Sequence, residues 1–480
     1  MRYCGITENF HNAAIAFIEE DGDISYAEES ERYSKNKNDA LLNYQQIKKI
    51  KDDDNITFYE DLDLRLKQIE YFNLPEYILH NIKSVKHHSR YKVDSYHNHH
   101  ISHAAASYYT RPWNSSSDTV LMTIDGFGEW ESSTIMDHKF NVLYKEEFPK
   151  SIGEIYAIVT DTLNLKPLEE EYILMGMAAY GQPIFLDSIT SHVKEYQNLD
   201  NYKENKLKLL NKFNELKMQN EFDFAASIQA WAEIEILKIA KIARRYGSKL
   251  CYSGGVAQNI LANTKIKSIF DDVWIVSNPS DGGSALGCAA RTYALKTGND
   301  RINWKDPYLG FDMGEINAKE VVDYLLEYSY CGIASGRAEF GPRALGNRSL
   351  IADPRRDVKD TVNQVKRRQT FRPFAPAILE EYANAYFEGP MNEYMQFSSI
   401  AKHDYKSVTH VDGTARVQLV RKNCSSVLRN ILEEFYEKTG VPMLLNTSLN
   451  IRGKPIINNK YDCFLFEKLN KTKVFYNDIS

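Results

Sequence analysis

The chain has 480 residues, of which 43% are hydrophobic and 26% charged, and its formal net charge is −6. This length exceeds one ordinary hydrophobic core and predicts two domains. The composition is that of a globular protein, and the negative balance excludes a global field that draws a protein to DNA or anionic lipid. The six cysteines include no CxxC pair, which argues against a disulfide framework or zinc ribbon. We find no signal peptide and no apolar run of membrane-spanning length, so we expect a cytoplasmic protein with no membrane partner.

The first part of the chain predicts short strands followed by helices. Strands are expected at "RYCGITE", "NAAIAFIEE" and "ISYAEE", with a hairpin turn at Asp21-Gly22-Asp23. Residues 40–92 are charged and predict mostly helix, and "DTVLMTIDGFGEW" predicts a buried strand that ends at Asp125-Gly126. A long helical region is expected over residues 185–247.

Two strand–turn–helix units follow, "KLCYSGGVAQNILANTKI" and "VWIVSNPSDGGSALGCAARTYA". They indicate an α/β sheet whose ligands lie at the strand ends. The glycine pairs in "SGGVAQN" (253–259) and "SDGGSALG" (280–287) stand where backbone N–H groups and a helix dipole can hold a phosphate. One such pair could serve close packing alone, but two after consecutive strands favour nucleotide binding.

A change of pattern near residue 305 predicts a boundary between a first domain, 1–305, and a second, 306–480. Between residues 337 and 372 the second domain carries eight arginines, Arg337, Arg343, Arg348, Arg355, Arg356, Arg367, Arg368 and Arg372. Guanidinium groups bind phosphate and carboxylate with two parallel hydrogen bonds. In a chain of negative net charge, this stretch predicts a pocket for a small anion rather than a nucleic-acid groove.

Four of the 12 histidines lie within residues 97–103. His99 and His103 are four residues apart, so on a helix they share one face and can bind a single ion. Two imidazoles with a carboxylate form a site type that favours Fe(II), Zn or Mn. Asp125, at the end of a strand, and Asp281, at the start of a turn, are the candidate carboxylates. A histidine-rich surface helix is the alternative interpretation.

Several blocks in a fixed order resemble the O-carbamoyltransferase family, which includes nodulation protein U and the cephem and tobramycin carbamoyltransferases. The blocks include "HHISHAAASYY", "TIDGFGEW", "LMGMAAYG", "SGGVAQN", "SDGGSALGCAA", "GRAEFGPRALGNRSLIADPR", "KRRQTFRPFAP", "HVDGTARVQ" and "GVPMLLNTSLN". Together they run across nearly the full length. The chain departs from the family pattern, which usually has Lys, Glu, Phe and Glu, at Ile173, Gln369, Leu449 and Lys454.

The resemblance implies an α/β protein with two domains. The first would be an actin/hexokinase-like (ASKHA) domain, which is a duplicated ribonuclease-H-like fold, and the second a YrdC-like α/β domain. The resemblance also implies Fe(II) or another divalent metal at His99, His103 and Asp281, with Asp125 at or beside the ion. The adenylate nucleotide would be held by "SGGVAQN", through Gly254, Gly255 and Asn259. The C-terminal site would be lined by Arg343, Lys366, Arg368, Arg372 and Ser448.

The resemblance further implies an ATP-dependent O-carbamoyltransferase. Carbamoyl phosphate and ATP, with Mg²⁺, would give carbamoyladenylate in the C-terminal domain, and the carbamoyl group would then pass with the help of the metal to an acceptor hydroxyl. The catalytic residues would be His11, Asp125, Lys366 and Arg368, with His11 near the acceptor hydroxyl.

The sequence does not determine the acceptor or the partners. A sugar or natural product is the usual family acceptor, and a hydroxymethylated pyrimidine in DNA, such as hydroxymethylcytosine, is an alternative because the composition suggests an AT-rich genome. Threonylcarbamoyl transfer to tRNA adenosine is the alternative reaction, and a nucleotide-dependent sensor or chaperone on an actin-like fold is the non-enzyme alternative. A homodimer also stays open.

Overall fold

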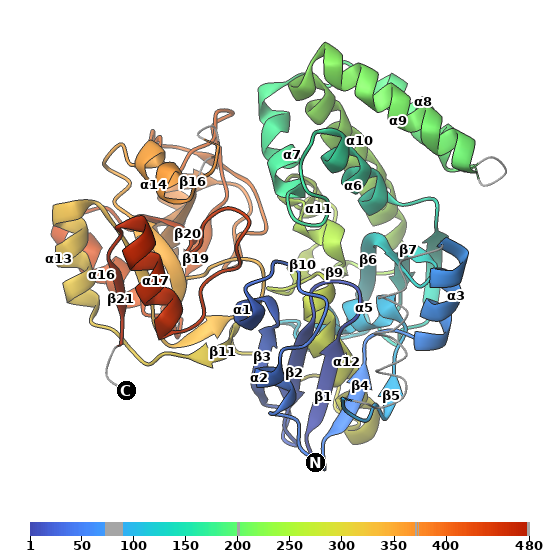
Figure 1. Ribbon diagram of the computed structural model, residues 1–480, viewed down its shortest axis with the longest axis horizontal. Coiled ribbons are helices and arrows are strands. Elements are labelled where there is room, and N and C mark those ends of the chain that lie inside the picture. The colour runs from blue at the N-terminus through green and yellow to red at the C-terminus, as the bar shows by residue number, and fades with distance from the viewer. Residues whose placement is uncertain (73–89, 199–201, 370–371, 373, 478–480) are drawn as a thin grey trace. The chain divides into compact units, whose positions relative to one another are not determined.

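A computed structural model describes residues 1–72, 90–198, 202–369, 372 and 374–477 (Figure 1). The chain forms two compact units. Unit 1 comprises Met1–Asp23 and Ala40–Asn303, and unit 2 comprises Ile24–Asp39 and Trp304–Ser480. Residues 24–39, which the sequence analysis assigned to the first domain, therefore pack with the second unit. The functional division at residue 305 stays a prediction.

Unit 1 contains two sheets built on one plan. The strands that unit 1 contributes to the first are β1 (Tyr3–Thr7), β2 (Ala14–Ile18), β4 (Asn55–Phe58) and β5 (Ser95–Tyr96). Those of the second are β6 (Thr119–Gly128), β7 (Glu131–Met136), β8 (Val142–Glu147), β9 (Lys249–Ser253) and β10 (Asp272–Ile275). In the first sheet β1 pairs antiparallel with β2 and parallel with β4, and β4 pairs parallel with β5. In the second sheet β6 pairs antiparallel with β7 and parallel with β9, and β9 pairs parallel with β10. The repeated order confirms the α/β class and the duplicated ribonuclease-H-like plan.

Two alanine-rich helices lie between these sheets. They are α5 (His99–Tyr109) and α12 (Asp281–Thr297). Helix α12 packs on β1 and β2, helix α5 packs on β6 and β9, and the two helices pack against each other. Small buried side chains such as Ala104, Ala105 and Ala289 allow this close approach. The layers place the start of each helix beside the ends of the central strands.

The remaining helices of unit 1 follow the predicted pattern in part. They are α2 (Tyr44–Ile47), α3 (Leu62–Phe72), α6 (Ile152–Thr162), α7 (Glu171–Met177), α8 (Leu186–Tyr196), α9 (Tyr202–Gln219), α10 (Glu221–Ala243) and α11 (Ile260–Ile266). The described part of the region 185–247 is helical as predicted, and Figure 1 shows α8 and α9 beyond α10 in green.

The sequence analysis was wrong on two strands of unit 1. Residues 55–58 within the expected helical segment form β4, because Ile56, Thr57 and Phe58 are buried in a parallel pairing with β1. Residues 73–89 of that expectation lie outside the described residues. The strand expected to end at Asp125-Gly126 continues to Gly128, where β6 still pairs with Glu131 of β7.

Unit 2 is built around a mixed six-stranded sheet in the order β19-β15-β20-β14-β12-β21. Its strands are β12 (Tyr330–Ala334), β14 (Arg348–Ala352), β15 (Ala375–Leu379), β19 (Gln418–Val420), β20 (Met443–Ser448) and β21 (Val474–Tyr476). Helices cover both faces: α13 (Ala318–Tyr328) and α16 (Leu428–Thr439) lie on one core, α14 (Lys359–Val365) and α17 (Lys460–Asn470) on the other. Along β14, Ile351 joins the first core while Leu350 and Ala352 join the second, which is the alternation expected of a strand buried on both faces.

Smaller elements complete unit 2. They are β3 (Ile24–Glu29), α1 (Glu31–Ser34), β11 (Tyr308–Asp312), β13 (Arg337–Glu339), α15 (Ala383–Tyr386), β16 (Phe387–Glu388), β17 (Ser399–Ala401) and β18 (Thr414–Ala415). Strand β3 packs against β11, which pairs with β13. The unit is an α/β domain, as the sequence analysis predicted.

Candidate functional site

The histidine cluster lies on one helix in unit 1. Helix α5 begins at His99 because Asn98 caps it: the Asn98 side chain accepts hydrogen bonds from the backbone N–H groups of His100 and Ile101 at 3.0 and 3.3 Å. His99 and His103 are therefore one turn apart on the same face, as their spacing predicted. Both side chains are almost fully buried, so the alternative of a histidine-rich surface helix is wrong.

Two aspartates from other elements meet this pair. His103 Nε2 lies 2.9 Å from Asp125 Oδ2 on β6 and 3.1 Å from Asp281 Oδ1 at the start of α12. His99 Nε2 lies 3.4 and 3.6 Å from the same two oxygens, and the two Nε2 atoms are 3.1 Å apart. The sequence analysis named all four residues, and the structure brings them together.

The geometry fits a single divalent ion. Four ligands at about 2.1 Å in a tetrahedron are separated by about 3.4 Å, which is the range seen here. One donor atom from each side chain lies within 4.8 Å of the others. Two imidazoles and two carboxylates are a ligand set that suits iron, zinc or manganese.

The same four groups perturb one another's ionisation. Burial alone would lower the pKa of His103, but the hydrogen bonds to Asp125 and Asp281 raise it above its ordinary value. Burial alone would raise the pKa of Asp125, but the two histidines hold it well below its usual range. The site is therefore a balanced group of opposite charges, in which a divalent cation would replace the histidine protons.

The backbone also fixes the carboxylate of Asp125. Its Oδ1 accepts hydrogen bonds from the N–H groups of Gly126 at 2.8 Å and Gly255 at 3.3 Å, which leaves Oδ2 facing the histidines. Gly255 belongs to the "SGGVAQN" segment, so this glycine loop supports the candidate metal centre directly.

The other histidines of the cluster point elsewhere. His100 Nδ1 lies 3.0 Å from Thr134 Oγ1, and burial lowers its pKa to about 3. His97 Nε2 lies 3.0 Å from Thr292 Oγ1, and burial lowers its pKa to about 4. Both rings act as neutral polar groups within the packing rather than as ligands.

His11 lies at the edge of the metal cluster. Its Nε2 is 3.4 Å from Asp281 Oδ2, the carboxylate oxygen that faces away from His103. Its Nδ1 is 2.7 Å from Asn12 Oδ1, which fixes Nδ1 as the protonated nitrogen when the ring is neutral. Nε2 is then the basic nitrogen of a partly exposed imidazole.

The residues of the predicted nucleotide loop make contacts that stabilise the fold. Gly254 has φ +92°, and a Cβ there would lie 2.1 Å from the carbonyl oxygen of Ile124, so only glycine fits. Asn259 caps α11 by accepting from Ala262 N–H at 3.1 Å, and its amide pairs with that of Gln229. These contacts account for the residue types, and the binding of a nucleotide here stays a prediction.

Unit 2 gathers positive side chains that we call the cationic group: Arg343, Lys366, Arg368, Arg372 and Arg416. Lys366 Nζ donates to the Ser448 carbonyl and hydroxyl and to Asn450 Oδ1, the last at 2.9 Å. Burial, together with Arg368 and Arg372, lowers the pKa of Lys366 well below its usual range. Burial and the guanidinium groups of Arg343, Arg368 and Arg372 likewise lower the pKa of Arg416. A bound anion would offset this crowding of positive charge.

Arg416 and Asn450 were missed by the sequence analysis. Arg416 lies in the "HVDGTARVQ" block, which carried the resemblance but has no other arginine to mark a cluster. Conversely, several arginines of the predicted anion stretch have other partners. Arg348 is fully buried and donates to backbone carbonyls including those of Ser335 and Phe311, and Arg355 pairs with Asp353.

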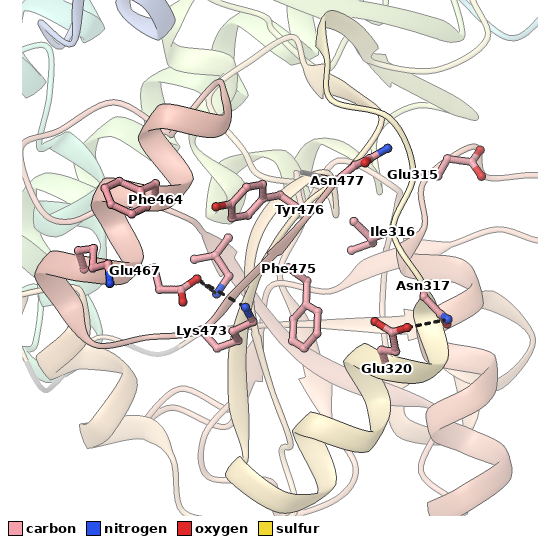
Figure 2. Close-up of a pocket in the computed structure, with 12 residues that line it drawn as sticks. Glu315, Ile316, Asn317, Glu320, Phe464, Glu467, Lys473, Phe475, Tyr476 and Asn477 are labelled. Carbon is pink, nitrogen blue, oxygen red and sulfur yellow. Dashed lines mark hydrogen bonds and ion pairs between the residues drawn. The ribbon is translucent and has the colours of Figure 1, made fainter. Parts of the chain in front are cut away.

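Unit 2 also has a surface pocket of about 510 Å³ that shares no residue with the cationic group. Figure 2 shows it beside the end of β21, with the Asn317–Glu320 hydrogen bond at 3.2 Å and the Lys473–Glu467 ion pair at 3.8 Å along its walls. Both charge signs line it, and no single ligand type is indicated.

Comparisons with known proteins identify the family of both parts of the chain. A family model for the carbamoyltransferase N-terminus matches residues 56–290, and one for the carbamoyltransferase C-terminus matches residues 322–476. An uncharacterized protein of Synechocystis sp. is 28% identical, with 96% of this chain and 94% of that protein covered. Nodulation protein NolO of Bradyrhizobium diazoefficiens is 30% identical, with 76% of this chain and 75% of that protein covered.

The chain belongs to the carbamoyltransferase family. It is therefore an enzyme that transfers a carbamoyl group. Among solved structures, component A of the (R)-2-hydroxyglutaryl-CoA dehydratase of Acidaminococcus fermentans covers 62% of this chain and 98% of its own at 12% identity. The TM-score of this match is 0.39. In the described part of the chain, no helix is both long and apolar enough to cross a bilayer.

Proposed function

We propose that the protein is an ATP-dependent O-carbamoyltransferase that uses carbamoyl phosphate and passes the carbamoyl group to an acceptor hydroxyl at a metal centre. The observation that carries the proposal is the convergence of His99, His103, Asp125 and Asp281, in a chain of this family. The cationic group in unit 2 supports a separate activation step.

Activation is assigned to the cationic group. Carbamoyl phosphate and ATP with Mg²⁺ are anions that need charge neutralisation. Water splits carbamoyl phosphate into carbamate and inorganic phosphate, and the carbamate oxygen then bonds to the α-phosphorus of ATP as pyrophosphate leaves, which gives carbamoyladenylate. Lys366 is held on Ser448 and Asn450 and can place its ammonium group at a phosphate oxygen. Arg343, Arg368, Arg372 and Arg416 can bind phosphate oxygens with their planar forks.

Transfer is assigned to the histidine–aspartate cluster. A divalent ion there would supply a Lewis acid for the carbamoyl carbonyl or the acceptor hydroxyl. His11 is the base: Nε2 accepts the hydroxyl proton as the acceptor oxygen bonds to the carbamoyl carbon and AMP departs. The resulting Nε2–H faces Asp281 Oδ2 at 3.4 Å, so the carboxylate stabilises the imidazolium. Gly254, Gly255 and Asn259 are the proposed contacts to the adenylate.

The activation step is tested by pyrophosphate release from ATP in the presence of carbamoyl phosphate. Arg372→Ala should lose this release while its metal content stays that of the wild type. Arg355→Ala removes the same charge from an exposed position paired with Asp353 and serves as the matched control. Undiminished pyrophosphate release by Arg372→Ala would contradict the assignment of the cationic group.

The acceptor is tested by mass spectrometry. Sugars, natural products with free hydroxyls and DNA containing hydroxymethylcytosine should be incubated with carbamoyl phosphate, ATP and enzyme. A mass increase of one carbamoyl group identifies the acceptor class. A parallel incubation contains tRNA and threonine, and threonylcarbamoylated adenosine there, with no carbamoylated hydroxyl compound, would overturn the proposal.

A further inference from the structure

The buried carboxylate of Glu60 lies behind the candidate metal centre. Glu60 follows β4, and its side chain is fully buried in unit 1. The hydroxyl of Ser102 on α5 donates to the Tyr59 carbonyl at 2.8 Å, which holds this segment against the helix that carries both histidines. A carboxylate in such a position is costly to bury unless it has a partner.

Three buried polar atoms without hydrogen bonds face one another here. Within the described residues, both carboxylate oxygens of Glu60 and the Nδ1 atom of His99 have no hydrogen-bond partner. Glu60 Oε2 lies 3.8 Å from His99 Nδ1, and Glu60 Oε1 lies 3.5 Å from Arg65 Nε. Buried polar groups are almost always paired in native proteins, so three unpaired atoms in one place indicate a hydrogen bond that forms in the metal-bound protein.

The orientation of the His99 ring explains which contact that is. His99 Nε2 faces the two aspartates and His103, so it is the nitrogen available to an ion. A neutral imidazole that gives its Nε2 lone pair to a metal carries its proton on Nδ1. That proton then points at Glu60. A histidine ligand commonly donates its second N–H to a carboxylate, which fixes the tautomer and the ring orientation.

The second histidine shows the same arrangement with a weaker acceptor. His103 Nδ1 lies 3.0 Å from Ser284 Oγ, so its N–H can donate to a hydroxyl. The two ligands thus have different partners behind them, a neutral hydroxyl for His103 and a charged carboxylate for His99. Because a carboxylate is the stronger acceptor, a hydrogen bond from His99 Nδ1–H to Glu60 would anchor His99 more firmly than Ser284 anchors His103.

We propose that Glu60 is a positioning residue of the metal centre, which accepts a hydrogen bond from His99 Nδ1–H and holds the ring for metal binding through Nε2. The inference rests on the proposed metal centre. Arg65 Nε lies 3.5 Å from the other carboxylate oxygen of Glu60, on the opposite side from His99. Glu60 touches neither substrate nor ion and acts through His99 alone.

The test is Co(II) binding by the full chain, measured by competition with a chelator and by the ligand-field absorption of the bound ion. Glu60→Ala should weaken Co(II) binding by about 10–100-fold, the usual loss when such a carboxylate is removed. Glu60→Gln, whose amide oxygen can still accept from Nδ1–H, should recover most of the affinity. Its absorption bands should resemble those of the wild type.

Asp54→Asn is the matched control. Asp54 is also a buried carboxylate of unit 1 paired with an arginine, Arg2, but it directly precedes β4, whereas Glu60 follows the other end of that strand. It should lose stability without changing Co(II) affinity. If Glu60→Ala binds Co(II) with wild-type affinity, or if Asp54→Asn weakens Co(II) binding equally, the role of Glu60 is overturned while the metal centre stands. A wild-type protein that binds no Co(II) would overturn the metal centre itself, and the inference with it.

Discussion

Gly128 lies under the ring of His99, and its substitution gives a sharp test of the metal centre. A Cβ built at Gly128 would lie 1.9 Å from His99 Cδ2 and 2.1 Å from Cγ. Ordinary contacts begin near 3.4 Å, so the ring would have to move by about 1.5 Å. The ring is enclosed by Tyr59 and His103 and cannot move away freely.

This displacement is large compared with the tolerance of a metal site. Ligand distances are held within about 0.2 Å, so a shift of about 1.5 Å removes His99 Nε2 from the ion. Loss of a whole ligand should cost more than the loss of its supporting partner, and we expect Gly128→Ala to weaken metal binding by at least about 100-fold. That factor corresponds to about 2.7 kcal/mol of binding free energy.

Gly126→Ala is the matched control on the same strand. A Cβ at Gly126 would meet no atom within 4 Å, and its N–H would still donate to Asp125. Both variants are measured by chelator competition with Zn(II) or Co(II), and circular dichroism verifies that they fold. Wild-type affinity in Gly128→Ala, or equal weakening in Gly126→Ala, would refute the assignment of His99 as a ligand.

Three further predictions concern the two half-reactions. Burial and the nearby arginines lower the pKa of Lys366, and a bound anion raises it again, so inorganic phosphate should bind with uptake of a proton at pH values between that depressed pKa and 10.5. Calorimetry in buffers of different ionisation enthalpy measures the proton uptake, and Lys366→Met should abolish it. Arg416→Met should weaken phosphate binding by about tenfold or more, as expected for a lost charge-assisted contact of about 1.5–3 kcal/mol; equilibrium dialysis checks this, and unchanged binding would exclude Arg416 from the site. His11→Asn should release pyrophosphate normally yet transfer carbamoyl poorly; full transfer would show that His11 is only structural, and equal loss of both steps would indicate misfolding.

The local patterns of the sequence predicted much of the candidate site. The spacing of His99 and His103 required one helix face, and the Asn98 cap fixed where that helix begins. The strand–turn–helix segments around Gly254 and Asp281 were correctly placed because glycine and aspartate at a strand end have few other conformational uses. These are short-range effects, which residues close in sequence decide.

Contacts between residues distant in sequence could not be predicted from such local patterns. The two apolar residues of β4, Ile56 and Phe58, are too few to distinguish it from its charged surroundings, and only its pairing with β1 makes it a strand. Residues 24–39 follow β2 directly, yet they pack with unit 2, which no local signal indicates. Arg416 joins Arg368 and Arg372 across many intervening residues.

The sequence by itself determined which residue types could form a metal centre and an anion site, since ligand chemistry and helical spacing follow directly from the order of the residues. The tertiary structure alone decided which of them meet. It brought Asp125 and Asp281 to the two histidines, turned His100 toward Thr134, and set Glu60 behind His99. The physical reason is that these contacts join strands and helices distant in sequence, and only the packing of α5 and α12 between two sheets fixes their distances.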